Sequence, residues 1–248
     1  QVVDNLFARA EEMGMLQVDQ ENMGDRLKCI GNEEICSRYA TYVLGRYVRS
    51  RIWFGQDPML VIKSAEPYIT VDSAKKELHG IVRYMESINK EWKHLLEKPA
   101  PDFRFENVKG EMVSLSDFRG YFVLLDVWNI YCGICILQMP YLRKLEPELE
   151  KLGVQIIGIS SDSQNLKEKW KTFVEEEEML GVQVIMDKGL SSQFIKDYCV
   201  SSFPVFCLIN PDGYVVHARL PLPQSQKFMQ IVQQEVDAYN IKKRDHPL

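Results

Sequence analysis

The sequence lacks several features that would assign it to a specialised class of protein. It contains no run of about 18 apolar residues, the length that a membrane-spanning helix requires. Its six cysteines among 248 residues are too few for a disulfide scaffold. Basic and acidic residues are interspersed at a net charge of −5, so the basic stripe typical of nucleic-acid binding is missing. The hydrophobic content of 46% is enough for one large core or two modest ones, and two fit better.

Metal-binding patterns are also scarce. A structural zinc site at Cys132 and Cys135 would need a second cysteine pair or histidines at suitable spacing, and the chain offers neither. His79 and His94 have no partner at ligand spacing. We therefore expect neither a metal nor another cofactor.

The stretch 122–135 carries the clearest chemical signal. Residues 122–127 form a short β-prone apolar run, interrupted by Asp126, that predicts a buried parallel strand. Cys132 and Cys135 follow after a short link, and a helix starting at Cys132 would place both sulfurs on one face. The free N–H groups at such a helix start would stabilise the Cys132 thiolate, which makes Cys132 the candidate nucleophile. The alternatives are a structural zinc site and a static disulfide.

The segment 128–135, Trp-Asn-Ile-Tyr-Cys-Gly-Ile-Cys, resembles the active-site segment of thioredoxin-fold proteins. Asp126 matches their buried acid, Pro140 the proline inside their helix, and Phe203-Pro204 the cis-proline that faces the redox pair. The segments 99–103 and 115–120 resemble the leading hairpin of TlpA/ResA-like thiol-disulfide oxidoreductases, which are related to AhpC/TSA proteins. The resemblance covers about residues 99–240.

This resemblance implies a thioredoxin-like α/β fold, with a central mixed sheet, flanking helices, a leading β-hairpin and an internal insertion. It implies a thiol-disulfide oxidoreductase that acts as a reductant on protein disulfides and is served by an upstream redox partner. Cys132 would attack the substrate and Cys135 would resolve the mixed disulfide. The expected substrate-contacting residues are Trp128, Gly133, Ile134, Phe203 and Pro204. Ile134 and Phe203 depart from the thioredoxin pattern at positions that tune potential and substrate fit.

Asp126 is the expected general base and acid of the resolving step. Strand alternation places it on the same face as Leu124 and Trp128, so burial should raise its pKa. A carboxyl group that titrates near neutral pH can take the proton of Cys135. The alternative is a carboxylate satisfied by the backbone or by a lysine, with no catalytic part.

The sequence of residues 1–98 predicts a small helical domain with no candidate catalytic or metal-binding residues. We recognise no family in it. Helices are expected over 2–15, from Asn32 as N-cap, from about 57–58, and from 72 to about 96. The apolar stripe from Ile35 to Tyr47 is the candidate face for contact with residues 99–240 or with a second copy in a homodimer. Two prolines at 99 and 101 predict a linker, so the expected domains are 1–98 and 99–248.

The remaining elements of residues 99–248 follow from periodicity and turn signals. Hairpins are expected at 103–108 with 111–115 and at 205–209 with 214–220. A strand at 154–160 should parallel the first through a helical crossover, and the insertion should hold a strand at 182–186. Helices are expected over 132–151, 165–179, 190–198 and 221–239, with a frayed tail from Lys242.

The other four cysteines leave alternatives open. Cys29 and Cys36 flank Gly31-Asn32, whose break in the helix would let them bond, or they are buried thiols. Cys199 and Cys207 are expected as inert thiols, with a second redox pair as the alternative.

Two other functions compete with disulfide exchange: a peroxiredoxin-like thiol peroxidase, and a non-enzymatic binding module with a structural disulfide. Peroxiredoxins carry their attacking cysteine alone after a threonine and a proline, unlike Cys132. Family analogy places the protein outside the cytoplasm, in a bacterial periplasm. The start at Gln1 is consistent with a removed leader or membrane anchor and equally with a shortened chain.

Overall fold

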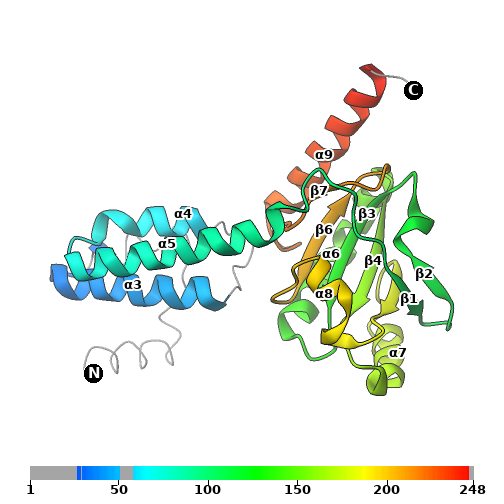
Figure 1. Ribbon diagram of the computed structural model, residues 1–248, viewed down its shortest axis with the longest axis horizontal. Coiled ribbons are helices and arrows are strands. Elements are labelled where there is room, and N and C mark those ends of the chain that lie inside the picture. Colours follow the sequence, from blue (N-terminus) through cyan, green and yellow to red (C-terminus); the bar gives the residue numbers. More distant parts are fainter. Residues whose placement is uncertain (1–26, 29, 51–57, 246–248) are drawn as a thin grey trace. The chain divides into compact units, whose positions relative to one another are not determined.

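The computed structural model describes residues 27–28, 30–50 and 58–245 (Figure 1). The chain divides into two compact units between Lys90 and Glu91, each with a hydrophobic core of its own. The division falls before the predicted linker because Trp92 and Leu95 already pack into the core of the second unit. The two predicted domains, 1–98 and 99–248, stay a proposal. None of the described helices combines the length and apolarity needed to cross a membrane.

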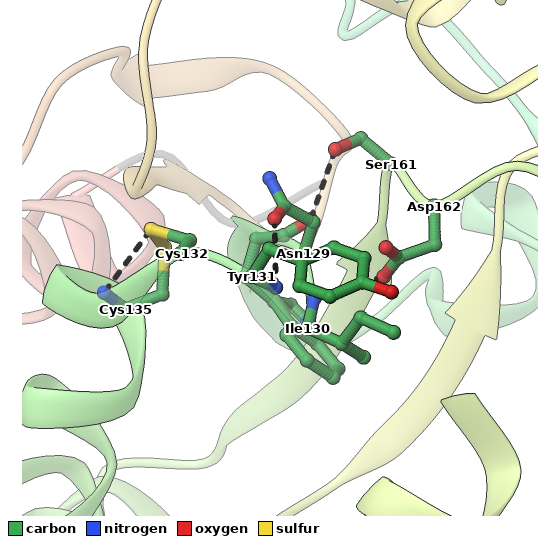
Figure 2. Close-up of a disulfide and its surroundings, with 8 residues drawn as sticks. Asn129, Ile130, Tyr131, Cys132, Cys135, Ser161 and Asp162 are labelled. Atoms are coloured by element: carbon green, nitrogen blue, oxygen red, sulfur yellow. Dashed lines mark hydrogen bonds between the residues drawn. A yellow bond between two sulfur atoms is a disulfide. The ribbon is translucent and has the colours of Figure 1, made fainter. Parts of the chain in front are cut away.

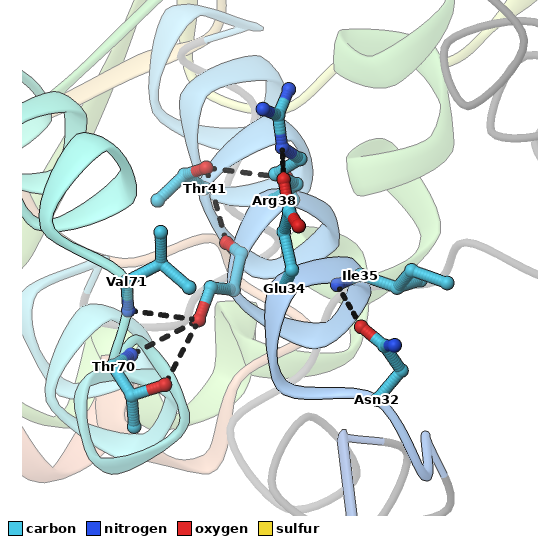
Figure 3. Close-up of polar contacts among 8 residues, drawn as sticks. Asn32, Glu34, Ile35, Arg38, Thr41, Thr70 and Val71 are labelled. Carbon is cyan, nitrogen blue, oxygen red and sulfur yellow. Dashed lines mark hydrogen bonds and ion pairs between the residues drawn. The ribbon is translucent and has the colours of Figure 1, made fainter.

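The first unit is helical. Its elements are α3 (Glu33–Ser50), α4 (Pro58–Ala65), the 3₁₀ turn η1 (Glu66–Tyr68) and α5 (Asp72–Lys93), which continues into the second unit. The predicted N-cap is confirmed, because the Asn32 side chain accepts a hydrogen bond from the backbone N–H of Ile35 at 3.0 Å (Figure 3). Glu33 and Glu34 lie in the first turn, where the helix dipole favours negative charge.

Buried Ser37 links α3 to the turn that precedes α5. Its hydroxyl oxygen accepts from the backbone N–H groups of Thr70 (3.0 Å) and Val71 (3.4 Å), and its hydroxyl group donates to the carbonyl oxygen of Tyr68 (3.2 Å). Figure 3 shows Thr70 and Val71 beside α3. These bonds satisfy backbone groups of the turn that leads into α5.

The predicted apolar stripe of α3 is partly wrong. Val43 and Tyr47 are buried, but Ile35 is 44% exposed, and Cys36 lies inside the core in its place. Several predictions concern residues outside the described ones, namely the helix over 2–15, Cys29 and the first residue of the 57–58 helix start.

The second unit contains a mixed seven-stranded sheet in the order β2-β1-β5-β4-β3-β6-β7. The strands are β1 (Arg104–Asn107), β2 (Met112–Ser114), β3 (Phe122–Trp128), β4 (Val154–Ser160), β5 (Val182–Ile185), β6 (Val205–Ile209) and β7 (Val215–His217). Central β3 runs parallel to β4 and antiparallel to β6, which confirms the predicted crossover unit and both predicted hairpins. The insertion strand β5 lies between β4 and the leading hairpin.

The two faces of β3 face different layers. Val123, Leu125 and Val127 belong to the core that also holds Phe194 of α8 (Gln193–Asp197). Phe122 and Leu124 pack instead with α6 (Gly133–Lys151) and α9 (Gln226–Asp245). On that same face Trp128 packs with α6 and α7 (Lys167–Glu176). All seven residues of β3 are buried, as expected for a strand covered on both sides.

Helix ends account for the main differences from prediction. The helix predicted over 165–179 is a 3₁₀ turn, η3 (Gln164–Leu166), followed by α7, which ends at Glu176. Four consecutive glutamates repel one another and the negative end of the helix dipole, which explains the early end. The helix predicted over 190–198 is the 3₁₀ turn η4 (Gly189–Ser191) followed by α8. Helix α9 begins only after Pro221 and Pro223 and runs to Asp245, because the basic residues 242–244 suit the C-terminal end of the dipole. The predicted fraying from Lys242 is therefore wrong, because residues 242–245 are still part of α9.

Candidate active site

Cys132 and Cys135 meet at the start of α6. Cys132 is the N-cap residue, half-buried, and its Sγ accepts a hydrogen bond from the backbone N–H of Cys135 at 3.2 Å (Figure 2). Cys135 lies one turn deeper and is 4% exposed. The two sulfurs form a disulfide, with Cα atoms 5.2 Å apart. A reaction partner from solvent can therefore approach Cys132 more readily than Cys135.

The loop 129–131 before Cys132 is held by the end of β4. The buried Asp162 carboxylate accepts from the backbone N–H of Ile130 (3.0 Å) and from the Ser160 hydroxyl (2.7 Å). Ser161 donates its N–H (2.9 Å) and its hydroxyl (3.2 Å) to the carbonyl oxygen of Trp128. Figure 2 shows Ser161 and Asp162 facing this loop. The position of the reactive cysteine therefore depends on a neighbouring strand as well as on its own helix.

Asp126 lies on the α6 face of β3, between Leu124 and Trp128 in the strand alternation. It is 6% exposed, and burial raises its pKa to about 7, as the sequence predicted. Among the described residues, no hydrogen bond or ion pair reaches this carboxylate, so the alternative of a partnered carboxylate lacks support. A small pocket leads to it between α6, β5 and residues 178–180, and exposed Arg143 and Glu178 are part of the lining.

Gln183 of β5 fixes the wall beside Asp126. Its Oε1 accepts from the indole N–H of Trp128 at 3.2 Å, and its amide donates to the carbonyl oxygen of Leu180 at 2.6 Å. The side chain crosses Gly158, the β4 neighbour of Asp126, where an added Cβ would lie 2.1 Å from Gln183 Oε1. A side chain at position 158 would push Gln183 away from these two hydrogen bonds, so glycine at this position of β4 lets Gln183 keep its place.

The predicted substrate-contacting residues lie in different environments. Gly133 is exposed, and Ile134, Phe203 and Pro204 are half-buried; the Phe203–Pro204 peptide bond is cis, as predicted. Val205 pairs with Val127, so Pro204 lies at the sheet edge where β3 ends, and Phe203 and Cys132 pack against the same cluster.

Trp128 lies deeper than the other predicted substrate-contacting residues. It is fully buried against α6 and α7 and bonded to Gln183, so its burial argues against direct substrate contact. In this chain three residues separate the tryptophan from the first cysteine, which leaves it at the end of β3. Tyr131, directly before Cys132, is 65% exposed and occupies the outward position.

Sequence reasoning missed Tyr131, Asp162 and Gln183. Tyr131 could have been found from its place next to Cys132. Asp162 lies two residues after the end of β4, which is parallel to β3, and polar residues where the carboxyl ends of parallel strands meet are a usable signal. Nothing in the sequence marks Gln183, because its importance depends on the register between β4 and β5.

The other described cysteines form no disulfide with one another. Cys36 is a buried free thiol whose Sγ donates to the Leu27 carbonyl oxygen at 3.5 Å. Cys207 is buried in β6, and burial raises the pKa of its thiol to about 12, as expected of an inert thiol. Cys199 is partly exposed and is not part of a disulfide. Cys199 and Cys207 therefore do not form the second disulfide that the alternative of a redox pair would place here. Within the described residues, no group of three or more histidine, cysteine or acidic side chains is arranged to hold a metal ion.

Comparisons with known proteins agree with this geometry. The AhpC/TSA family model matches residues 96–218. Over 137 residues the chain is 34% identical to the thiol-disulfide oxidoreductase ResA of Bacillus cereus, covering 55% of this chain and 76% of the relative. ResA of Halalkalibacterium halodurans is 30% identical over 139 residues, with the same coverage of both chains. The thioredoxin domain of a thiol-disulfide oxidoreductase from Bacteroides vulgatus superimposes with a TM-score of 0.51 at 31% identity, covering 57% of this chain and 97% of that domain.

Proposed function

The chain belongs to the ResA family of thiol-disulfide oxidoreductases, and we propose that it reduces protein disulfides through Cys132 and Cys135. The observation that carries this proposal is the unequal setting of the two sulfurs at the start of α6. One is half-buried at the N-cap and accepts a backbone hydrogen bond, while the other is buried one turn deeper. Disulfide exchange needs this pairing of an attacking and a resolving thiol.

Cys132 is the proposed nucleophile of the reduced protein. The N–H of Cys135 that donates to its sulfur would also stabilise a thiolate, and the positive end of the α6 dipole acts in the same direction. The thiolate attacks one sulfur of the substrate disulfide. A bond forms between that sulfur and Cys132, the substrate S–S bond breaks, and the leaving thiolate takes a proton from water. In the disulfide neither cysteine titrates, so the lowered pKa of Cys132 stays a prediction.

Cys135 is the proposed resolving thiol, and Asp126 its proton acceptor. With a pKa of about 7, the Asp126 carboxyl is ionised in a large fraction of molecules near neutral pH and can accept the Cys135 proton. The Cys135 thiolate then attacks the Cys132 sulfur, which releases the substrate as a thiol after proton return. Two electrons pass to the substrate, and the pair ends as the disulfide. An upstream dithiol must supply two electrons and two protons before the next cycle.

The environment of the pair is proposed by analogy. Four residues, Gly133, Ile134, Phe203 and Pro204, would border the bound substrate, since they lie beside Cys132 or face it.

The cellular location is proposed by analogy as well. The TlpA/ResA-like relatives act outside the cytoplasm, and we propose a periplasmic location for this chain on that resemblance alone. A membrane anchor, and a homodimer formed through the helical unit, stay hypotheses.

Trapping of mixed disulfides tests the assignment of roles. Cys135→Ser removes the resolving thiol and should accumulate mixed disulfides with client proteins, whereas Cys132→Ser should accumulate none. Equal trapping by both variants would sink the assignment. Insulin reduction measured beside peroxide consumption separates the reductase from a thiol peroxidase and from a binding module, because only the reductase reduces insulin and leaves peroxide.

A further inference from the structure

The outward face of α6 carries apolar side chains that are exposed or half-buried. Ile134, Leu137 and Tyr141 follow at intervals of three and four residues, so they share one side of the helix. Leu137 is 63% exposed and Tyr141 42% exposed, while Ile134 is half-buried. The opposite side of the same helix is buried against β3. An apolar stripe therefore begins at the redox pair and runs down α6.

This stripe begins next to Cys132 Sγ, the atom that bonds to a client protein. Disulfide exchange joins a client sulfur to Cys132 Sγ, so the client chain lies against the surface around Cys132 while the mixed disulfide exists, and the first turns of α6 are part of that surface. At about 1.5 Å of rise per residue, Leu137 lies about 8 Å and Tyr141 about 14 Å beyond Cys132 along the helix axis. An extended chain advances about 3.3 Å per residue, so it reaches these positions two to four residues from its own cysteine.

One lysine lies beside this stripe, and another lies beside the residue that precedes Cys132. Lys144 lies on α6 one turn after Tyr141, with its Nζ 5.8 Å from the ring centre. Lys169 of α7 has its Nζ 4.7 Å from the ring centre of exposed Tyr131. Neither lysine forms an ion pair with a described residue, whereas Lys171 is paired with Glu168. The surroundings of the disulfide therefore offer positive charge on a chain whose net charge is −5.

We propose that Ile134, Leu137 and Tyr141, with Lys144 beside Tyr141 and Lys169 beside Tyr131, form a docking face for a polypeptide client. The client carries apolar side chains two to four residues from its reactive cysteine and carboxylates beside them. Apolar contact with Leu137 and Tyr141 holds the client segment, and the two lysines attract its carboxylates and speed the encounter. The proposal rests on the proposed function and adds the class of substrate that the pair accepts.

Three disulfide-linked peptide dimers and one small disulfide test the docking face. The first peptide has leucine and phenylalanine three and four residues after its cysteine, with two glutamates. The second replaces the glutamates with lysines, and the third replaces the apolar pair with serines. The small neutral probe is 2-hydroxyethyl disulfide. Single-turnover reduction by the whole reduced chain gives a second-order rate constant for each. The wild type should reduce the acidic apolar peptide fastest, and this preference over the lysine peptide should shrink as salt is added.

Surface variants separate the two contributions. Leu137→Ala with Tyr141→Ala should slow reduction of the acidic apolar peptide about tenfold, since contact residues at the centre of an interface contribute most of its affinity. Lys144→Glu with Lys169→Glu should reverse the order of the acidic and basic peptides. Both pairs should leave the rate with 2-hydroxyethyl disulfide unchanged. The matched controls are Leu190→Ala, at a leucine 66% exposed in η4, and Lys151→Glu at the far end of α6.

Each outcome supports or overturns the proposal. Equal wild-type rates on all three peptides, with normal reduction of 2-hydroxyethyl disulfide, would overturn the docking face and leave the proposed function standing. No reduction of 2-hydroxyethyl disulfide by the wild type would overturn the proposed function, and the docking face with it. If the alanine pair instead converts a dimer into a monomer in sedimentation without slowing any peptide, the stripe covers a second copy of the chain and the client assignment is wrong.

Discussion

Replacing Asp126 with asparagine tests the most unusual ionisable group of the site. The carboxyl is 6% exposed in the middle of β3, and burial raises its pKa from an ordinary 3.8 to about 7. The two values differ by about three, and each pKa unit corresponds to ~1.4 kcal/mol, so ionised Asp126 destabilises the folded chain by roughly 4 kcal/mol. Asparagine keeps the side-chain shape and cannot ionise, so it removes this destabilisation.

The sign of the pH dependence follows from the raised pKa. Below pH 3.8 the Asp126 carboxyl is protonated in the folded and in the unfolded chain, so its ionisation takes nothing from the free energy of unfolding. Between pH 3.8 and about 7 only the folded chain holds the proton, so wild type loses ~1.4 kcal/mol of unfolding free energy per pH unit relative to Asp126→Asn. Above about pH 7 both states are ionised and the difference stays constant. From pH 5 to pH 8 the variant should thus gain roughly 3 kcal/mol on wild type.

Urea unfolding of the oxidised proteins at pH 5, 6, 7 and 8 measures this gain, with tryptophan fluorescence reporting on buried Trp128 and Trp170 of the second unit. Asp237→Asn, a matched change at an exposed position of α9, should show no comparable gain. A difference between wild type and Asp126→Asn that does not vary from pH 5 to 8 would refute the raised pKa. Single-turnover release of the mixed disulfide should be slower in the variant between about pH 6 and 8, and rates that track wild type would refute the proton-transfer role.

Two other predictions concern the supports of the site. Asp162→Ala leaves the Ile130 N–H and the Ser160 hydroxyl without their acceptor. The variant should therefore destabilise the second unit by about 1–3 kcal/mol and should reduce small and protein disulfides more slowly. Asp162→Asn should restore most of the stability and most of the reduction rate. If the alanine variant exchanges disulfides at the wild-type rate, the loop does not need this anchor. The second unit alone, residues 91–248, includes Leu95 of its own core and should therefore fold without the helical unit. It should reduce 2-hydroxyethyl disulfide at the rate of the whole chain, but it should reduce protein clients more slowly. Equal rates with clients would exclude a role of the helical unit in recognition.

The strands were predictable because short-range signals determine them. The apolar run of β3 and the Asn210-Pro-Asp-Gly213 turn specify their elements locally, and each is present. Helix ends were less predictable because electrostatics competes with periodicity there. The four glutamates 175–178, where α7 ends, shorten a helix whose apolar spacing continues. The basic residues 242–244 lengthen α9 beyond its last apolar position.

The chemistry of the site was predictable only where it lies along one segment of chain. Cys132, Cys135 and Asp126 come from a single strand and the helix after it, so spacing and alternation sufficed to place them. Asp162 and Gln183 act across strand pairs, and only the register between β3, β4 and β5 brings them to the loop and to Trp128. The burial of Trp128 has the same origin, because the length of the link to Cys132 decides whether the indole lies in the core or beside the sulfur.

The short separation of the two cysteines also argues against a purely structural disulfide. A disulfide stabilises a fold mainly by restricting the unfolded chain, and the effect grows with the length of the loop it closes. Cys132 and Cys135 are only three residues apart, so this loop contributes about 2 kcal/mol, against about 4.7 kcal/mol for a loop of about 100 residues. The α6 N-terminus is already fixed by the N-cap bond and by the anchored loop 129–131, which reduces the need for a covalent link there. A pair that adds little stability, and that leaves one sulfur accessible at a helix N-terminus, is better suited to exchanging disulfides than to holding the fold together.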